Sequence, residues 1–308
     1  MSKVIVTGGA GFIGSHLAEE LVRRGHKVII IDNLSTGKTS NIEPFLGNAG
    51  FVHGSITDLP LLRKLFSDVD YVFHQAAVPS VARSISNPKV SHNANTTGTL
   101  NVLLAARDNG VKKVVYASSA AVYGESEALS EVEDMTPNPQ SPYAVTKLAG
   151  EYYCKVFQEI YGLNTVSLRY FNVYGPRQDP DSPYAAVIPI FLSNVLAGKP
   201  PVIFGDGEQS RDFIFIRDIT EANILAAETR ATGIINIGSS KRVTINDLAR
   251  LIIKLAGNTT IKPVYKDPRP GDIVHSLADI SRAESFGFRP RYSLEEGLKE
   301  TLARFPKV

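Results

Sequence analysis

The sequence predicts a doubly wound α/β fold, in which helices cover both faces of a mostly parallel sheet. Short β-branched runs alternate with segments whose apolar residues recur at helical spacing, from residue 3 to about residue 170. The first strand, glycine turn, helix and strand together occupy about 30 residues, the length of a βαβ unit. Because parallel strands need such a crossover, this pattern favours a parallel sheet.

The expected elements follow in chain order. Strands are predicted at residues 3–7, 27–31, 50–53, 70–74, 113–117 and 164–169, and helices at 12–24, 58–67, 95–109 and 142–161. Proline and glycine then interrupt the pattern, but a strand at 213–216, a helix at 218–228 and a strand at 234–237 are expected to return to the main sheet. We therefore expect one domain of residues 1–170 with 213–238, and a smaller C-terminal α/β substrate-binding domain of residues 171–212 and 239–308.

Composition limits the class of protein. The 308 residues are 43% hydrophobic and carry a net charge of +2 with interspersed signs, so no nucleic-acid surface is expected. The single Cys154 excludes an internal disulfide and fits a reducing cytoplasm. No apolar run is long enough to span a bilayer, and the first strand begins too early for a signal peptide. The scattered histidines lack ligand spacing, so no metal is expected.

A glycine-rich turn, GGAGFIG at residues 8–14, lies between the first strand and the first helix. Glycines permit a tight turn and a close approach of backbone to a pyrophosphate, and the helix N-terminus offers free N–H groups to the phosphates. Asp32 ends the second strand, where its carboxylate can accept hydrogen bonds from an adenosine ribose and would repel a 2′-phosphate. The turn therefore predicts a site for NAD rather than NADP, with residues 33–37 around the ribose; Lys38 is the neighbour that argues against excluding NADP.

The segment SPYAVTK, residues 141–147, is expected to begin a helix, because Ser141 can cap it and Pro142 fits its first position. Tyr143 and Lys147 then share one face, about one turn apart. A lysine ammonium at that distance is expected to stabilise the phenolate and lower the tyrosine pKa. The pair can therefore accept a proton from an alcohol.

Two serines, Ser118 and Ser119, follow the buried strand at 113–117. Ligands of such sheets bind outside the carboxyl ends of the strands, so these hydroxyls are expected near the tyrosine helix. A hydroxyl there can hydrogen-bond a substrate alcohol and orient it.

The ordered motifs TGGAGFIGSH (7–16), HQAA (74–77), NTTGTLN (95–101), SSAAVYG (118–124) and SPYAVTK resemble the extended short-chain dehydrogenase/reductase family, whose core is Rossmann-type. LRYFNVYGPRQ (168–178), FGDGEQSRDFI (204–214) and PRPGDIVHSLAD (268–279) are similar to its nucleotide-sugar 4-epimerase branch. The resemblance implies a UDP-sugar substrate, tightly held NAD, and a homodimer formed through the helices at 95–109 and 142–161.

The resemblance also implies roles for individual residues. The catalytic residues would be Ser119, Tyr143 and Lys147, with Ser118 as the alternative serine. The cofactor-binding residues would be Gly8, Gly11, Phe12, Ile13, Gly14, Asp32, Asn33, Ser35, Thr36, Gly37, Ser55, Ile56, Gln75, Ala76, Ala77, Asn95, Ser118, Tyr143, Lys147 and Tyr170. The substrate-binding residues would be Ser119, Ala120, Tyr143, Asn172, Ala186, Val187, Phe204, Arg211, Arg269, Asp272 and Ser276. Ser55 stands where the family usually has an acidic residue.

The resemblance implies interconversion of UDP-N-acetylglucosamine with UDP-N-acetylgalactosamine, and also of UDP-glucose with UDP-galactose. Ser276 supports the acetamido substrates, because members with a tyrosine there have less room. A UDP-glucuronate 4-epimerase remains open as an alternative. A 4,6-dehydratase and a sugar-nucleotide decarboxylase are disfavoured, since Ala120 and Ala121 stand where the dehydratase branch has proton-transferring residues. A non-catalytic NAD-sensing protein is disfavoured because Tyr143 and Lys147 are both present.

Overall fold

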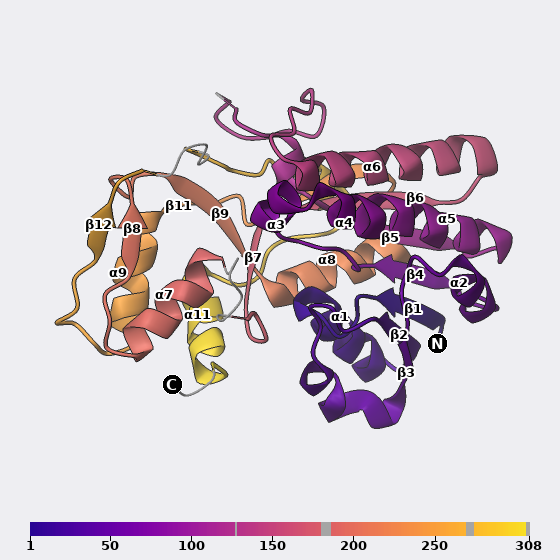
Figure 1. Cartoon of the computed structure of the whole chain (residues 1–308), viewed down its shortest axis with the longest axis horizontal. Helices are drawn as coiled ribbons and strands as arrows, with labels where there is room; N and C mark the ends of the chain where they lie inside the picture. Colours follow the sequence, from indigo (N-terminus) through magenta and orange to yellow (C-terminus); the bar gives the residue numbers. More distant parts are fainter. Residues whose placement is uncertain (127, 180–185, 269–273, 306–308) are drawn as a thin grey trace.

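The computed structural model describes residues 1–126, 128–179, 186–268 and 274–305 (Figure 1). Its centre is a seven-stranded sheet of order β10-β6-β5-β4-β1-β2-β3, in which every neighbouring pair is parallel. The strands are β1 (Lys3–Thr7), β2 (Lys27–Asp32), β3 (Ala49–His53), β4 (Tyr71–His74), β5 (Lys113–Ser119), β6 (Thr165–Tyr170) and β10 (Gly233–Ile237). The predicted parallel sheet is confirmed.

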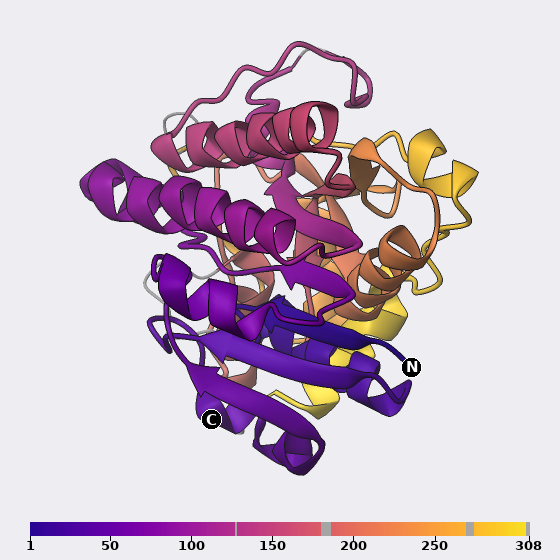
Figure 2. The same ribbon diagram turned by 90° about the vertical axis from the view of Figure 1, so that its right-hand side faces the viewer.

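Helices cover both faces of this sheet, which confirms the doubly wound arrangement. On one face lie α2 (Leu59–Leu65), α5 (Gly98–Asp108) and α6 (Pro142–Tyr161), and α5 and α6 run side by side (Figure 2). On the other face lie α1 (Phe12–Arg23) and α8 (Ile216–Glu228), which pack on each other. Each face has its own apolar core, with Leu62, Val102 and Phe157 in one and Leu17 and Ile219 in the other.

Short elements position the loops around the sheet. They are η1 (Thr39–Asn41), η2 (Glu43–Asn48), α3 (Val81–Ser86), α4 (Pro88–His92), the π-helical turn η3 (Asn93–Thr97) and η4 (Ala120–Val122). The helix predicted at 95–109 therefore begins as a π-helical turn and continues as α5. Such turns occur often at functional sites.

A smaller α/β unit lies beside the main sheet in Figure 1. It contains a three-stranded sheet of order β11-β9-β7 and a two-stranded sheet of β12 and β8. Its elements are β7 (Asn172–Tyr174), α7 (Val187–Leu196), β8 (Val202–Phe204), β9 (Ser210–Phe215), β11 (Arg242–Thr244), α9 (Ile245–Leu255), β12 (Val264–Lys266) and α11 (Leu294–Ala303), whereas α10 (Ser281–Ser285) packs against β10 of the main sheet.

The prediction that a strand at 213–216 joins the main sheet is wrong. These residues belong to β9, which pairs with β7 and β11, and α8 already begins at Ile216. Phe213, Ile214 and Phe215 are all buried, and an apolar run of this length does not reveal which sheet buries it. The predicted strand at 234–237 does return to the main sheet, as β10 beside β6.

None of the helices in the described part of the chain is both long enough and apolar enough to cross a bilayer. The same residues contain no group of three or more histidine, cysteine, aspartate or glutamate side chains arranged to hold a metal ion.

Candidate active site

The glycine turn after β1 leaves no room for side chains. A Cβ atom on Gly8, whose φ is +69°, would lie 2.7 Å from the Cα atom of Ala76. A Cβ atom on Gly14 would lie 2.2 Å from the carbonyl oxygen of Gly8. The first helix begins after Gly11 with no side-chain cap, so its first N–H groups are available to an anion. The turn therefore fits the pyrophosphate of a dinucleotide.

Asp32 closes the turn at the carboxyl end of β2. Its Oδ2 accepts a hydrogen bond from the N–H of Ala10 at 3.0 Å, and its Oδ1 accepts one from Leu34 at 2.8 Å. Each oxygen keeps a second lone pair for a ribose hydroxyl. A Cβ atom on Gly37 would lie 2.9 Å from Asp32 Oδ2, so glycine keeps this space open. Lys38 is the residue that weakens the prediction of NAD over NADP. Its ammonium group forms an ion pair with Asp179 at 3.0 Å.

A cavity extends from this turn across the carboxyl ends of the parallel strands, where ligands of such sheets bind. Most of the predicted cofactor residues line it: Gly8, Gly11, Phe12, Ile13, Gly14, Asp32, Asn33, Ser35, Thr36, Ser55, Ile56, Gln75, Ala76, Ala77, Ser118, Tyr143, Lys147 and Tyr170. Sequence reasoning missed Ile31, Gly54, Val78, Pro79, Ala94 and Ala117, which also line it. Most of these adjoin predicted residues, so extending each motif along the chain would have found them.

Asn95, predicted to bind the cofactor, is buried and does not line the cavity. Its Oδ1 accepts a hydrogen bond from the N–H of Val78 at 2.7 Å, and its Nδ2 donates to the carbonyl of Val78 and to Thr146. The hydroxyl of Thr146 in turn donates to the carbonyl of Tyr143. Asn95 therefore fixes the cavity wall at Val78 to the start of α6.

A buried histidine continues this connection to the glycine turn. His74 Nδ1 lies 2.8 Å from the hydroxyl of Thr7, and its Nε2 lies 2.9 Å from the hydroxyl of Thr99. Thr99 donates its only hydroxyl proton to the carbonyl of Asn95, so it must accept from Nε2–H, and Nδ1 must accept from Thr7. Burial lowers the pKa of His74 to about 3, which keeps the neutral ring that this pattern requires.

The tyrosine and lysine lie where the sequence predicts them, near the start of α6. Ser141 accepts a hydrogen bond from the N–H of Ala144, Pro142 occupies the first turn, and the helix starts here for these reasons. The ammonium group of Lys147 lies 5.9 Å from the centroid of the Tyr143 ring and donates to the carbonyl of Ala117 at 2.7 Å. The carbonyl group of Ala117 in β5 thus fixes the ammonium group of Lys147 near the ring of Tyr143.

Burial governs the protonation of both groups. Burial raises the pKa of Tyr143, and a hydrogen bond with Ser119 acts in the opposite direction without reversing the shift. Burial also lowers the pKa of Lys147 to about 8, against the opposing charge of Glu151. The expectation that Lys147 lowers the tyrosine pKa below its ordinary value is therefore wrong for the protein alone, because desolvation of the phenolate is the larger effect.

The two candidate serines face different partners. Ser118 is buried and donates its hydroxyl proton to Oε1 of Glu151 at 2.5 Å. Ser119 accepts a hydrogen bond from the N–H of Ala121 and is hydrogen-bonded to Tyr143. Of the two serines, Ser119 is therefore the one paired with Tyr143, whereas Ser118 lines the cavity and is bonded to Glu151. Ala120 and Ala121 begin η4 and carry no ionisable group.

A second cavity adjoins the first, since Phe12, Ile13 and Pro79 line both. Five predicted substrate residues line it: Asn172, Ala186, Val187, Phe204 and Arg211. Sequence reasoning missed Tyr174, Gln178, Phe191 and Gln209, among others, which also line this cavity. Three of them, Tyr174, Gln178 and Gln209, lie within the segments similar to the epimerase branch. Arg269 and Asp272 lie outside the described residues.

Ser276 is the remaining predicted substrate residue. It is buried and lines neither cavity, but its N–H donates to the carbonyl of Ser210 at 3.2 Å. Ser210 directly precedes Arg211 in β9, so Ser276 lies beside the second cavity.

This fold and this glycine turn are those of a dinucleotide-dependent enzyme. Residues 4–238 match the model of the NAD dependent epimerase/dehydratase family. The chain belongs to this family.

Similar proteins refine the class of enzyme. A protein from Methanocaldococcus jannaschii named putative UDP-glucose 4-epimerase is 42% identical over 97% of both chains. The structure of UDP-N-acetylglucosamine 4-epimerase from Methanobrevibacter ruminantium, in complex with UDP-N-acetylmuramic acid, is 47% identical, with a TM-score of 0.95 and 99% and 98% of the two chains covered. The structure of UDP-glucuronic acid 4-epimerase from Bacillus cereus, in complex with UDP-glucuronic acid and NAD, is 35% identical, with a TM-score of 0.90 over 98% of both chains.

The predicted resemblance is therefore confirmed. The chain is an NAD-dependent enzyme of the UDP-sugar 4-epimerase group, and the glycine turn and Asp32 are the features of its own structure that fit NAD.

Proposed function

We propose that the enzyme interconverts UDP-N-acetylglucosamine and UDP-N-acetylgalactosamine, and also UDP-glucose and UDP-galactose, by inversion at C4 of the sugar. The observation that carries this proposal is the pairing of Ser119 with Tyr143 by a hydrogen bond, because Tyr143 lines the cofactor cavity and that cavity adjoins the second one. In this proposal the Rossmann-type domain holds NAD and the smaller unit holds the UDP-sugar.

The proposed chemistry assigns a separate task to each side chain. Ser119 orients the 4-hydroxyl, Tyr143 removes its proton and later returns it, and Lys147 holds a positive charge below the phenolate. Bound NAD supplies a hydride acceptor for C4 and a positive charge beside Tyr143. Because burial raises the pKa of Tyr143, the phenolate depends on the charge that Lys147 contributes.

Ser276 supports the acetamido substrates. An N-acetyl group is several heavy atoms larger than a hydroxyl, and overfilling a packed site costs about 1–3 kcal/mol, or roughly 10- to 100-fold in rate. A serine beside the second cavity leaves more room than a tyrosine would. UDP-glucuronate is the second candidate, favoured by the similarity to the Bacillus cereus enzyme.

One experiment tests these alternatives together. The purified protein is incubated separately with UDP-N-acetylglucosamine, UDP-glucose and UDP-glucuronate, and the products are separated by chromatography. We expect the 4-epimers of the first two sugars. Accumulation of a 4-keto-6-deoxy sugar would instead indicate a dehydratase, which Ala120 and Ala121 argue against because neither transfers protons. Absence of any turnover would favour a binding protein.

We also propose a homodimer formed through α5 and α6. Large apolar side chains are exposed on one face of α6, at Val145 (53% exposed), Tyr152 (56%), Val156 (39%) and Ile160 (69%). Their spacing of seven, four and four residues places them on a single stripe of the helix. A second copy of the same stripe would cover these residues, and light scattering of the purified protein measures the resulting mass.

A further inference from the structure

The segment that carries Ser276 is hydrogen-bonded through its backbone to two buried carboxylates. The N–H of Leu277 donates to Oε2 of Glu131 at 2.7 Å, and the N–H of Ala278 donates to Oδ2 of Asp212 at 3.2 Å. Glu131 is 4% exposed and Asp212 is fully buried. The two carboxylates therefore accept hydrogen bonds from the backbone N–H groups of two consecutive residues in the segment.

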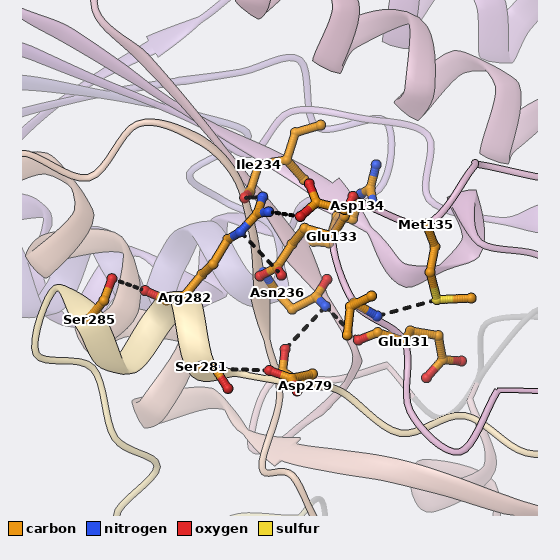
Figure 3. A network of polar contacts seen from close by, with 12 residues as sticks. Glu131, Glu133, Asp134, Met135, Ile234, Asn236, Asp279, Ser281, Arg282 and Ser285 are labelled. Carbon is orange, nitrogen blue, oxygen red and sulfur yellow. Dashed lines mark hydrogen bonds and ion pairs between the residues drawn. The ribbon is translucent and has the colours of Figure 1, made fainter.

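The backbone of Glu131 holds the same segment. Its N–H donates to the carbonyl of Leu277 at 2.8 Å, and its carbonyl accepts from the N–H of Asp279 at 3.0 Å. The carbonyl also accepts from Nδ2 of Asn236 at 2.9 Å, and Figure 3 shows this contact within a larger polar network. Glu131 is thus fixed by contacts on both its backbone and its side chain.

The carboxylate of Glu131 lies beside Ser276, since it accepts from the N–H of the next residue, Leu277, at 2.7 Å, and a hydrogen bond with the Ser276 side chain opposes the rise in the pKa of Glu131. Because a carboxylate can only accept, the Ser276 hydroxyl is the donor in this bond. A serine hydroxyl has one proton and two lone pairs, so after this bond Oγ has only lone pairs to offer. A substrate group that reaches Ser276 therefore meets a hydrogen-bond acceptor, with a carboxylate directly behind it.

The polar network leaves the charge of Glu131 without a cation among the described residues. The guanidinium of Arg282 pairs with Asp134 and lies 3.6 Å from Glu133 instead (Figure 3). Burial raises the pKa of Glu131, its hydrogen bonds oppose that shift, and the nearby charge of Asp212 adds to it. The field behind Ser276 is therefore negative whenever Glu131 is ionised.

We propose that Glu131 determines sugar specificity, by fixing Ser276 as an acceptor that favours an N–H donor at C2 and by repelling a carboxylate at C6. This inference rests on the proposed function, in which the second cavity holds the sugar and Ser276 lies beside it. It selects 2-acetamido sugars over uronates. The hydroxyl of Ser276 then accepts from the acetamide N–H and does not donate to the acetamide oxygen.

The geometry of inversion explains why one wall controls both substituents. The 4-keto sugar must present its other face to the cofactor before C4 is reduced. A half-turn of the ring about the line through C1 and C4 exchanges C2 and C3 with the ring oxygen and C5, which carries C6. A wall along one side of the ring therefore faces the C2 and C3 substituents in one orientation and C6 in the other. An acceptor backed by a carboxylate suits an N–H or hydroxyl donor and opposes a carboxylate.

The test compares Glu131→Gln with the matched control Glu133→Gln. The control removes the same charge two residues away in the same loop, where the carboxylate accepts from the N–H of Asn236 at 2.8 Å. For each holoenzyme, kcat/KM is measured with UDP-N-acetylglucosamine, UDP-glucose and UDP-glucuronate, and Kd is measured by calorimetry. A glutamine can donate to Ser276 and turn its hydroxyl proton toward the pocket. We expect Glu131→Gln to lower acetamido turnover and raise uronate turnover, each roughly three- to tenfold, the effect of one hydrogen bond.

A third variant separates the two parts of the inference. Ser276→Ala removes the acceptor but keeps Glu131, so acetamido turnover should fall while the uronate stays rejected. Equal changes for all three sugars in Glu131→Gln, or the same change of ratio in Glu133→Gln, would show a structural role and overturn the inference. Efficient wild-type turnover of UDP-glucuronate would overturn it as well, with the epimerase proposal intact. If the wild type epimerises no UDP-sugar, the proposed function fails and this inference fails with it.

Discussion

The change Glu151→Gln tests how the protein keeps Lys147 charged. Glu151 lies one turn after Lys147 on the buried face of α6, and its charge opposes the fall in the lysine pKa to about 8. Side chains four residues apart on a helix lie about 6 Å apart, and unit charges at that distance interact by roughly 3 kcal/mol at an effective dielectric constant of 20. Arg169 neutralises part of this field, so we expect the pKa of Lys147 to fall by about one unit.

The same change weakens the fold. Arg169 donates two hydrogen bonds to Glu151, at 2.8 and 2.7 Å, and both side chains are 1% exposed. Removing one partner of a buried ion pair costs about 3–5 kcal/mol, and glutamine, which keeps one acceptor, should cost about 3 kcal/mol of the free energy of unfolding. Denaturant unfolding measures this loss.

The pH profile of kcat distinguishes the electrostatic role from the structural one. Because the charged lysine is the active form, activity falls as pH rises through the pKa of Lys147. This falling limb should move to lower pH by about one unit in Glu151→Gln. Glu159→Gln is the control, since Glu159 lies on the same helix but is exposed, and its one ion pair among the described residues is with Lys155 at 3.9 Å. If Glu151→Gln lowers stability but leaves the falling limb of the pH profile at the wild-type pH, the electrostatic role of Glu151 is refuted.

Four further outcomes are expected. Tyr143→Phe should bind NAD but lose about 10²–10⁴-fold in turnover, because the general base is removed; near-normal kcat would contradict the assignment. Dinucleotide released by denaturing the purified protein should be NAD, since the carboxylate of Asp32 at the glycine turn would repel a 2′-phosphate and Lys38 is paired with Asp179; recovery of mostly NADP would show that Lys38 or a neighbour overrides Asp32. Ser276→Tyr should lower acetamido turnover by roughly 10- to 100-fold and spare UDP-galactose; a parallel loss of both activities would mean that Ser276 does not control access. Tyr152→Glu should convert a dimer to a monomer in light scattering, whereas Leu129→Glu, at a side chain that is 84% exposed elsewhere, should not; two variants of equal mass would argue against the α6 interface.

The main sheet was predictable because its strands are long, buried on both faces and separated by helices of regular period. Each of these features leaves a pattern in the sequence. The strands β7, β8, β11 and β12 have three residues each, too few to show any period, and none was predicted. The misassigned β9 shows a related limit. Burial of Phe213 to Phe215 makes a strand recognisable, but its partner sheet depends on contacts that the local sequence does not specify.

The candidate site also has features that the sequence predicts and features that it does not predict. The glycine turn, Asp32, Tyr143 and Lys147 are local motifs, and each has a spacing that a single turn or helix imposes. Their electrostatics are not local, since the pKa of Tyr143 rises through burial by segments brought together from several strands.

The position of Glu131 beside Ser276 is a feature that sequence patterns do not predict. It contacts Leu277, which lies 146 residues further along the chain, and no motif links the two. A glutamate in an irregular loop would ordinarily be exposed. Here its burial against Ser276 gives a small, permissive side chain a defined hydrogen-bonding polarity. In the specificity that we propose, substrate choice therefore depends on a pair of residues, one recognisable by its motif and the other by the structure alone.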